Sequence, residues 1–388
     1  MTTGRKRSIG VVGLALVAAG WWAAPYVSTT AFLLDIAGIR NLARRVMPVR
    51  AQIFSTSDID IPTRWGPLGA RLYQPRSSGH TVVVFPGVHG GGREEPRLAL
   101  LCGRLAATGL TVVCAPLPEL RQFLITPRST DAIEDVTRWT TANHALSPKG
   151  RVGMAAVSFA AGLALVAAGR PSLDGRIDVV LSVGGYGDLG RVLRYLCTGV
   201  LPDGTLLTPH EYSLAVIALG AVTRLAPADQ AAALERGIRL YLDATVDETP
   251  AGRLKAAAML QEARDLGRTL PEPSRSLLSA VLDRDRATLG RALLPWIDEL
   301  AAPAALSPER SRPPTAPLFL LHGRDDNVIP ASETPLLAAH LAREGHPPVR
   351  WLLTPLVSHA TLLGAPTAAV RDGWDLVRFW KALRDELE

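Results

Sequence analysis

The sequence has 388 residues, with 42 Lys or Arg and 36 Asp or Glu, so its formal net charge is +6. A chain of this length can bury a large core, and 47% apolar with 20% charged residues excludes wholesale disorder. The three cysteines show no CxxC spacing and cannot all pair within one chain. This pattern argues against a zinc site or a disulfide framework.

The positive charge is concentrated at the N-terminus. Residues 1–50 hold seven basic residues and one acidic residue, a net charge of +6, whereas residues 51–388 hold 35 residues of each sign. A neutral body argues against a nucleic-acid partner, while a basic N-terminus favours a membrane or a targeting signal. We therefore expect no nucleic-acid partner.

An uncharged apolar segment follows the first basic residues. Ile9–Val27 contains 19 residues, which as a helix span about 28 Å, close to the hydrocarbon thickness of a bilayer. Trp21, Trp22 and Tyr26 cluster at its far end, where aromatic rings favour the membrane interface. The pattern predicts an N-terminal transmembrane helix that contacts lipid through residues 9–27, in a single-pass membrane protein. A cleaved signal peptide and a buried core helix are the alternative interpretations.

Basic residues lie on both sides of this apolar segment. Those before it favour an extracytoplasmic body, but four arginines beyond it weaken the asymmetry and leave the side of the membrane open. The pattern over residues 39–46 is compatible with a helix lying flat on anionic headgroups or with a solvated linker helix. Residues 1–50 are expected to form a membrane anchor and a basic juxtamembrane segment. The four arginines are Arg40, Arg44, Arg45 and Arg50.

From residue 51 onward, short β-rich runs alternate with helical runs, which is typical of an α/β fold. Most runs after residue 80 are continuous Val, Ile, Leu and Phe, as expected for a mostly parallel sheet buried on both faces. The predicted strands are Ser57–Ile61, Gly69–Tyr73, Thr81–Phe85, Leu110–Ala115, Arg151–Val157, Ile177–Val183, Leu318–Leu321 and Arg350–Leu353. The predicted flanking helices are Glu95–Thr108, Thr130–Ala145, Phe159–Gly169, Glu333–Glu344 and Trp374–Leu387.

Residues 186–316 interrupt the alternation, because their pattern is mostly helical with few strand signals. We interpret them as a helical insertion into one α/β core made of residues 51–185 and 317–388. The insertion ends in a Pro-rich turn that leads into the next strand. Its predicted helices are Leu214–Arg224, Ala228–Asp243, Gly252–Leu266, Ser274–Leu282 and Ala287–Leu300.

Ser158 lies where a predicted buried strand runs directly into a helix rich in small residues, in the sequence Ala-Val-Ser-Phe-Ala. A sharp strand-to-helix turn lifts a serine above the sheet edge and requires small neighbours two residues to either side. The helix N-terminus supplies free amides that can stabilise an oxyanion. The alternative interpretation is an ordinary N-cap serine.

An acid and a histidine follow later strands. Asp326, with Asp325 as the reserve, lies in His-Gly-Arg-Asp-Asp-Asn after the strand that ends at Leu321, where a carboxylate can orient a histidine. His359 lies in an otherwise apolar segment after the strand that ends at Leu353. The non-catalytic alternatives are that the aspartates belong to an ordinary turn and that His359 is a packed, structural histidine.

The order Ser, Asp, His, with each residue at the carboxyl end of a strand, resembles the α/β-hydrolase superfamily. The resemblance covers residues 57–185 and 317–388, and it is strongest to the dienelactone-hydrolase and prolyl-oligopeptidase branch. It implies Ser158 as nucleophile, His359 as general base and then acid, Asp326 as the residue that orients the histidine, and a helical lid over residues 186–316. The strand-to-helix turn at Ser158 departs from the usual GxSxG pattern, because Ala replaces both outer Gly residues.

The oxyanion hole is expected after the strand Thr81–Phe85, where Pro-Gly stands in for the usual His-Gly of related hydrolases. This register implies that the backbone N–H groups of Val88 and Phe159 face the oxyanion. The following His-Gly-Gly-Gly string offers an alternative, with Gly90 and Gly91 as the donors.

Asp188, after the strand Ile177–Val183, is a weaker alternative to Asp326. The sequence as a whole predicts a membrane-anchored serine hydrolase that cleaves small, possibly apolar, carboxylic esters through an acyl-enzyme. No cofactor and no metal is implied. The alternative is a non-catalytic α/β-hydrolase fold that binds or scaffolds partners at the membrane.

Overall fold

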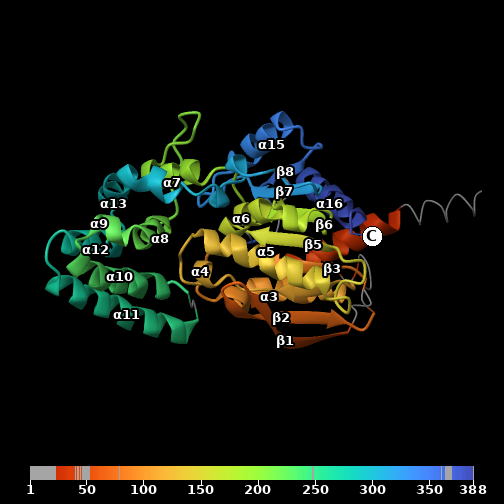
Figure 1. Ribbon diagram of the computed structural model, residues 1–388, viewed down its shortest axis with the longest axis horizontal. Helices are drawn as coiled ribbons and strands as arrows, with labels where there is room; N and C mark the ends of the chain where they lie inside the picture. The colour runs from red at the N-terminus through yellow and green to blue at the C-terminus, as the bar shows by residue number, and fades with distance from the viewer. Residues whose placement is uncertain are drawn as a thin grey trace, which may run out of the picture.

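The computed structural model describes residues 23–39, 41, 43, 45, 53–77, 79–246, 249–359, 361–362 and 369–387. In this part of the chain an eight-stranded sheet has the order β1-β2-β4-β3-β5-β6-β7-β8 (Figure 1). The strands are β1 Phe54–Thr63, β2 Gly66–Pro75, β3 Thr81–Phe85, β4 Thr111–Cys114, β5 Val152–Val157, β6 Ile177–Val183, β7 Leu318–Gly323 and β8 Arg350–Thr354. A short pair, β9 Val357–Ser358 and β10 Thr361–Leu362, follows β8.

The sheet is parallel from β4 to β8, and β1 and β2 extend it as antiparallel strands. All eight predicted strands are present, and those from Thr81 onward begin and end within two residues of their predicted bounds. Parallel strands place their carboxyl ends on one edge of the sheet, which in α/β folds is the edge that carries ligand sites. Residues that follow β3, β5, β6, β7 and β8 therefore meet there.

Two hydrophobic layers cover the sheet, because successive side chains of a strand point to opposite faces. On β3, Val83 and Phe85 belong to one layer, and Val82 and Val84 belong to the other. The first layer is covered by α5 Pro127–Ala142, α6 Phe159–Ala168 and α15 Glu333–Arg343. The second is covered by α3 Pro96–Ala107 and α16 Ala369–Asp385, and the short α4 Pro118–Arg121 lies in the loop after β4.

The chain between β6 and β7 is helical, and Figure 1 shows most of its helices gathered at one side of the sheet. Its helices are α7 Leu189–Thr198, α8 Ser213–Gly220, α9 Val222–Leu225, α10 Ala228–Asp243, α11 Pro250–Thr269, α12 Ser274–Leu282, α13 Arg286–Leu293 and α14 Ile297–Leu300. Buried residues of these helices, such as Leu234 and Leu278, join the first of the two layers. The insertion thus shares a core with the sheet.

The prediction of a transmembrane helix, and with it the membrane anchor, lipid partner and single-pass localisation, is wrong. No helix among the described residues is both long enough and apolar enough to cross a bilayer. Residues 9–22 of the predicted span lie outside the described residues. The following residues 23–36 form a helix that packs on α16, where Tyr26 stacks on Trp374 and Phe32 meets the edge of Trp380. Tyr26, the described member of the aromatic cluster interpreted as lying at the membrane interface, therefore packs on protein.

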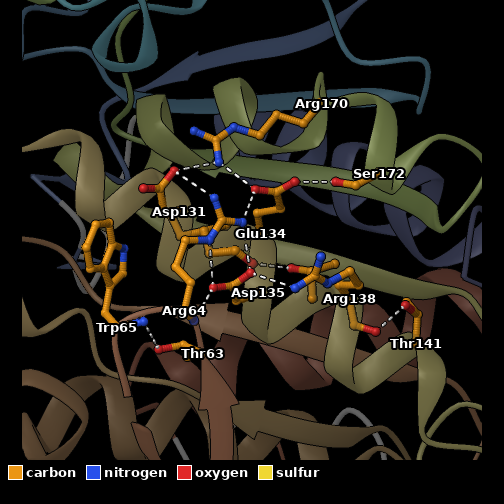
Figure 2. Close-up of polar contacts among 12 residues, drawn as sticks. Thr63, Arg64, Trp65, Asp131, Glu134, Asp135, Arg138, Thr141, Arg170 and Ser172 are labelled. Atoms are coloured by element: carbon orange, nitrogen blue, oxygen red, sulfur yellow. Dashed lines mark hydrogen bonds and ion pairs between the residues drawn. The ribbon is translucent and has the colours of Figure 1, made fainter. Parts of the chain in front are cut away.

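An ion-pair cluster joins the β1–β2 turn to the helices of the first layer (Figure 2). Arg64, in the two-residue turn between the strands, binds Glu134 and Asp135 of α5 and lies 3.4 Å from Asp131. Arg170, which follows α6, binds Asp131 and Glu134 from the other side. The Asp135 side chain is fully buried, so its charge depends on these partners.

We expect Arg64→Ala to lower the free energy of unfolding by about 3 kcal/mol, because it leaves buried carboxylates short of a partner. The matched control is Arg194→Ala, whose partner Asp298 is 86% exposed, and this change should cost at most about 1 kcal/mol. Urea unfolding at neutral pH measures both, and equal losses would contradict the role given to the cluster.

The effect of Arg64→Ala should also depend on pH. Burial raises the pKa of Asp135, but the hydrogen bonds from Arg64 outweigh burial and hold that pKa below its ordinary value. The contribution is therefore complete above the unfolded-state pKa of about 4 and is lost as the pH falls toward the lower folded-state pKa. The difference between wild type and Arg64→Ala should shrink in urea unfolding at pH 3.

Candidate active site

The three residues singled out by the sequence meet at the carboxyl edge of the sheet. Ser158 follows β5, Asp326 follows β7, and His359 follows β8 and β9. Because β5, β6, β7 and β8 are consecutive parallel neighbours, their ends bring together residues that lie far apart in the chain. Ser158 and His359, for example, are separated by 201 positions.

Ser158 has a backbone conformation that L-residues rarely adopt, with φ 59° and ψ −134°. Its N–H donates to Val183 O of β6 at 2.8 Å, which holds the turn against the sheet. A conformation of this kind costs about 1–3 kcal/mol and persists only where the surroundings impose it. The strand-to-helix turn therefore presents the hydroxyl at the sheet edge, as a nucleophile requires.

Small residues around Ser158 make this turn possible. A Cβ on Gly87 would lie 2.8 Å from the Ser158 Cβ, so glycine is required in the loop after β3. Ala156 and Ala160, two residues to either side, are fully buried. The strand-to-helix turn therefore accommodates alanine at both positions where the GxSxG pattern has glycine.

A continuous chain of hydrogen bonds joins the three side chains. The Ser158 Oγ lies 2.8 Å from His359 Nε2, and His359 Nδ1 lies 2.7 Å from Asp326 Oδ2. A carboxylate only accepts, so Nδ1 carries the proton and donates it to Asp326. Nε2 of a neutral His359 is then free to accept the proton of the serine hydroxyl.

The Asp326 carboxylate is held by its own loop as well as by His359. Its Oδ1 accepts hydrogen bonds from the N–H groups of Val328 and Ile329 at 2.9 and 3.0 Å. Burial raises the pKa of Asp326, but interactions with His322 and His359 outweigh burial and hold that pKa well below its ordinary value. Asp326 is therefore ionised throughout the neutral range and stabilises the correct tautomer of His359.

His322 and Gly323, at the end of β7, shape this loop. His322 is fully buried, and its Nε2 donates to Ile329 O at 2.9 Å while its Nδ1 lies 2.8 Å from Thr334 Oγ1. A Cβ on Gly323 would lie 2.4 Å from Val357 O, so glycine allows the segment before His359 to approach. His322 thus holds the loop that carries Asp326, and Gly323 leaves room for the segment that carries His359.

The candidate oxyanion donors lie beside the serine. Phe159 is the first residue of α6, where N–H groups have no acceptor within the helix. Val88 follows Gly87, the glycine that packs against Ser158. In the alternative arrangement, the Gly91 N–H already donates to His89 Nδ1 at 3.0 Å. This contact favours Val88 and Phe159 over the later glycines.

The other candidate acids occupy different positions. Asp325 is exposed, next to the buried Asp326. Asp188 caps α7 by accepting from Arg191 N at 2.7 Å, and it lies 3.3 Å from the Arg310 guanidinium. Within the described ranges, no group of three or more His, Cys, Asp or Glu is arranged to hold a metal ion.

Sequence reasoning missed residues that the insertion brings to the site. The backbone N–H of His210 donates to the backbone carbonyl of Asn327, beside Asp326. The His210 ring lies edge-on to the Tyr212 ring, with 4.5 Å between the ring centroids. Tyr212 lines the same cavity as Ser158 and His359. Neither residue belongs to a local motif, because only the packing of the insertion places them here. Burial lowers the pKa of His210, so this ring is neutral at neutral pH.

We expect Gly323→Ala to displace the segment that carries His359 and to lower the free energy of unfolding by about 1–3 kcal/mol. The matched control is Gly373→Ala in α16, where an added Cβ meets no atom within 4 Å and the change stabilises a helix by up to about 1 kcal/mol. Urea unfolding compares the two variants. A Gly323→Ala protein as stable as wild type would contradict the close approach.

No protein-family model matches the sequence, and no curated protein matches it by sequence. The chain is similar to solved structures, among them an esterase from Pyrobaculum calidifontis, with 18% identity, 92% of this chain and 91% of that chain covered, and a TM-score of 0.46. A thermostable carboxylesterase cloned from a metagenomic library has 16% identity, coverages of 92% and 98%, and a TM-score of 0.45. An acylaminoacyl peptidase from Pyrococcus horikoshii has 12% identity, coverages of 88% and 43%, and a TM-score of 0.43.

Similarities this distant carry no statement about activity, which has to be inferred from the site itself. The strand pairings give a mostly parallel sheet of eight strands. The strained serine turn follows β5, and the chain order is Ser, Asp, His. Together these features define an α/β-hydrolase fold, and the chain has that fold.

Proposed function

We propose that the protein is a serine hydrolase that cleaves carboxylic esters through an acyl-enzyme. The observation that supports this most strongly is the pair of hydrogen bonds, 2.8 and 2.7 Å long, that links Ser158 to His359 and His359 to Asp326. A nucleophile, a base and an orienting acid in this geometry are the requirements of acyl transfer. Asp326 acts by orienting His359 and stabilising its charged form.

In the first half of the proposed reaction, the Ser158 Oγ attacks the ester carbonyl carbon while His359 Nε2 takes the hydroxyl proton. The tetrahedral intermediate collapses, the bond to the alcohol oxygen breaks, and His359 returns the proton to that oxygen. In the second half, His359 takes a proton from water, the hydroxide attacks the acyl-enzyme, and Ser158 regains its proton as the carboxylic acid leaves. Every step uses groups of the chain itself, so the proposal needs no cofactor.

The negative charge of each tetrahedral intermediate requires donors that are already in place. We assign these to the N–H groups of Val88 and Phe159, the second of which also lies at the positive end of α6. A Cβ on Gly87, the residue before Val88, would lie 3.4 Å from Ser158 Oγ, so the loop that carries Val88 passes beside the serine. Removing one such donor in other hydrolases costs about 10²- to 10³-fold in rate.

We also propose that residues 186–316 act as a lid on the core formed by residues 51–185 and 317–388. The support is that His210 and Tyr212 reach the acid loop and the cavity beside Ser158. A buried cluster anchors the start of the insertion, where Arg191 binds Glu309 and Glu333. This anchor holds the base of the insertion, so any opening would take place further along it.

A fluorophosphonate probe should label the wild-type protein and should not label Ser158→Ala, because phosphonylation needs an activated serine oxygen. Labelling is read by intact mass and by the modified peptide. A matched control is Ser172→Ala, whose hydroxyl contacts Glu134 away from the site and which should label as wild type does. Absence of labelling in folded wild-type protein would favour the non-catalytic alternative.

Asp326→Asn should lower kcat by about 10³- to 10⁴-fold on an aryl acetate, because the amide no longer selects the tautomer with a free Nε2. The control is Asp325→Asn, at the exposed neighbouring residue. It should change kcat by less than about threefold, which is a change in activation free energy of less than about 0.7 kcal/mol. Steady-state kinetics with both variants at neutral pH tests the assignment. Equal effects at the two positions would overturn it.

A further inference from the structure

A cavity of about 910 Å³ begins beside Ser158 and His359. Its lining continues along the sheet face that α3 and α16 cover, and it ends at Ala31 and Phe32 of the helical residues 23–36. This is the second of the two hydrophobic layers, whereas the buried residues of the insertion belong to the first. The cavity therefore extends away from the insertion.

The side chains of β5 explain why this face is hollow. Ala155 and Val157 point toward the cavity and stay partly exposed although β5 is a central strand. Gly153 lies on the same face, where Leu387 takes the place of its missing side chain, because a Cβ there would lie 2.7 Å from Leu387 Cδ2. On the opposite face of the same strand, Met154 is only 1% exposed. Ala155 and Val157 thus border a channel that runs from Ser158 back along the strand as far as Leu387. We call it the β5 channel.

The walls of the β5 channel are mostly apolar. Among the charged residues that line it, Asp35 pairs with Arg104 at 2.9 Å and Glu95 pairs with Arg97 at 2.6 Å, whereas Arg384 donates to Ser28 Oγ at 2.9 Å. An apolar cavity of this kind is filled more favourably by an apolar group than by water. The apolar wall residues are Val82, Val84, Val179, Leu181 and Leu321 of the sheet, Leu98, Leu101 and Leu105 of α3, and Trp380 and Leu383 of α16.

We propose that the β5 channel holds the acyl chain of the substrate, and that the protein prefers esters of medium- to long-chain fatty acids. This inference rests on the proposed ester hydrolysis at Ser158. The acyl group stays attached to Ser158, which itself lines the channel, while the alcohol leaves and water takes its place. A deep apolar channel suits the acyl group, which remains bound to the protein. The alcohol departs on the side of His359 and the insertion.

The length of the channel sets the expected chain-length dependence. Gly153 lies five positions before Ser158, which at the rise of a β-strand is about 16 Å. Each methylene buried in the channel should raise kcat/KM by up to about fourfold, from the transfer free energy of one CH₂ group. The rise should end once the chain reaches the helical residues 23–36.

The experiment measures kcat/KM of the full chain on p-nitrophenyl acetate, butyrate, octanoate, decanoate and palmitate. A second series keeps the acetyl group and lengthens the alcohol. We expect kcat/KM to rise at least 100-fold from acetate to its maximum in the acyl series, and to vary by less than tenfold in the alcohol series. A flat acyl series, or a steep alcohol series, would overturn the inference.

Two variants narrow the channel from opposite walls, so that the failure of one to fold does not end the test. Ala155→Phe fills it from β5, and Leu101→Trp fills it from α3. Each should lower the ratio of kcat/KM for decanoate to that for acetate by at least tenfold. The matched control is Leu254→Trp, at a position of α11 that is 77% exposed, and it should leave the ratio within twofold of wild type.

The results distinguish a failure of the proposed ester hydrolysis from a failure of the acyl-chain assignment. If the wild type hydrolyses esters and loses activity in Ser158→Ala, but neither channel variant lowers the ratio, the proposed function stands and the β5 channel does not hold the acyl chain. If the wild type hydrolyses no ester of any length, the proposed function fails and this inference fails with it. A shared tenfold drop in the ratio for both variants supports the inference.

Discussion

The buried carboxylate of Asp326 is the constraint on which the arrangement of the site depends. It accepts from two backbone N–H groups of its own loop and from His359, and the fully buried His322 lies 3.4 Å away. A buried charge with fewer partners would be costly, so the loop, the histidine and the carboxylate stabilise one another. His359 in turn meets Ser158, whose turn is strained. The acid thus holds together three loops that the sheet brings to one edge.

Local pattern was enough to predict most of this framework. The continuous apolar runs of the parallel strands left little ambiguity, and helices α10 and α12 begin and end where periodicity placed them. The predicted helix over residues 287–300 is instead divided by a 3-10 turn, Leu294–Trp296, which contains a proline. No helix is predicted over α7, although Asp188, the weaker alternative for the catalytic acid, caps its start. An aspartate shortly after a strand is compatible both with a helix N-cap and with a catalytic loop.

The remaining features depend on contacts between distant segments. No local pattern reveals that Gly323 faces Val357, that His210 reaches Asn327, or that the insertion shares a core with the sheet. The N-terminal prediction failed for the same reason. A run of apolar and aromatic residues fits a bilayer and a protein groove equally well, and Tyr26 and Phe32 pack on α16. The helical residues 23–36 begin inside the span expected to contact lipid, and their later residues Ser28, Ala31 and Phe32 line the cavity proposed for the acyl chain.

The covalent intermediate provides the most direct test of the central claim, that Ser158 is a nucleophile activated by His359. Wild-type protein mixed rapidly with an aryl ester and quenched in acid should gain the mass of one acyl group, located on the peptide that contains Ser158. The released phenol should show a burst that approaches one equivalent per chain where deacylation is the slower step. An adduct on any other residue, or turnover that persists unchanged in Ser158→Ala, would contradict the account.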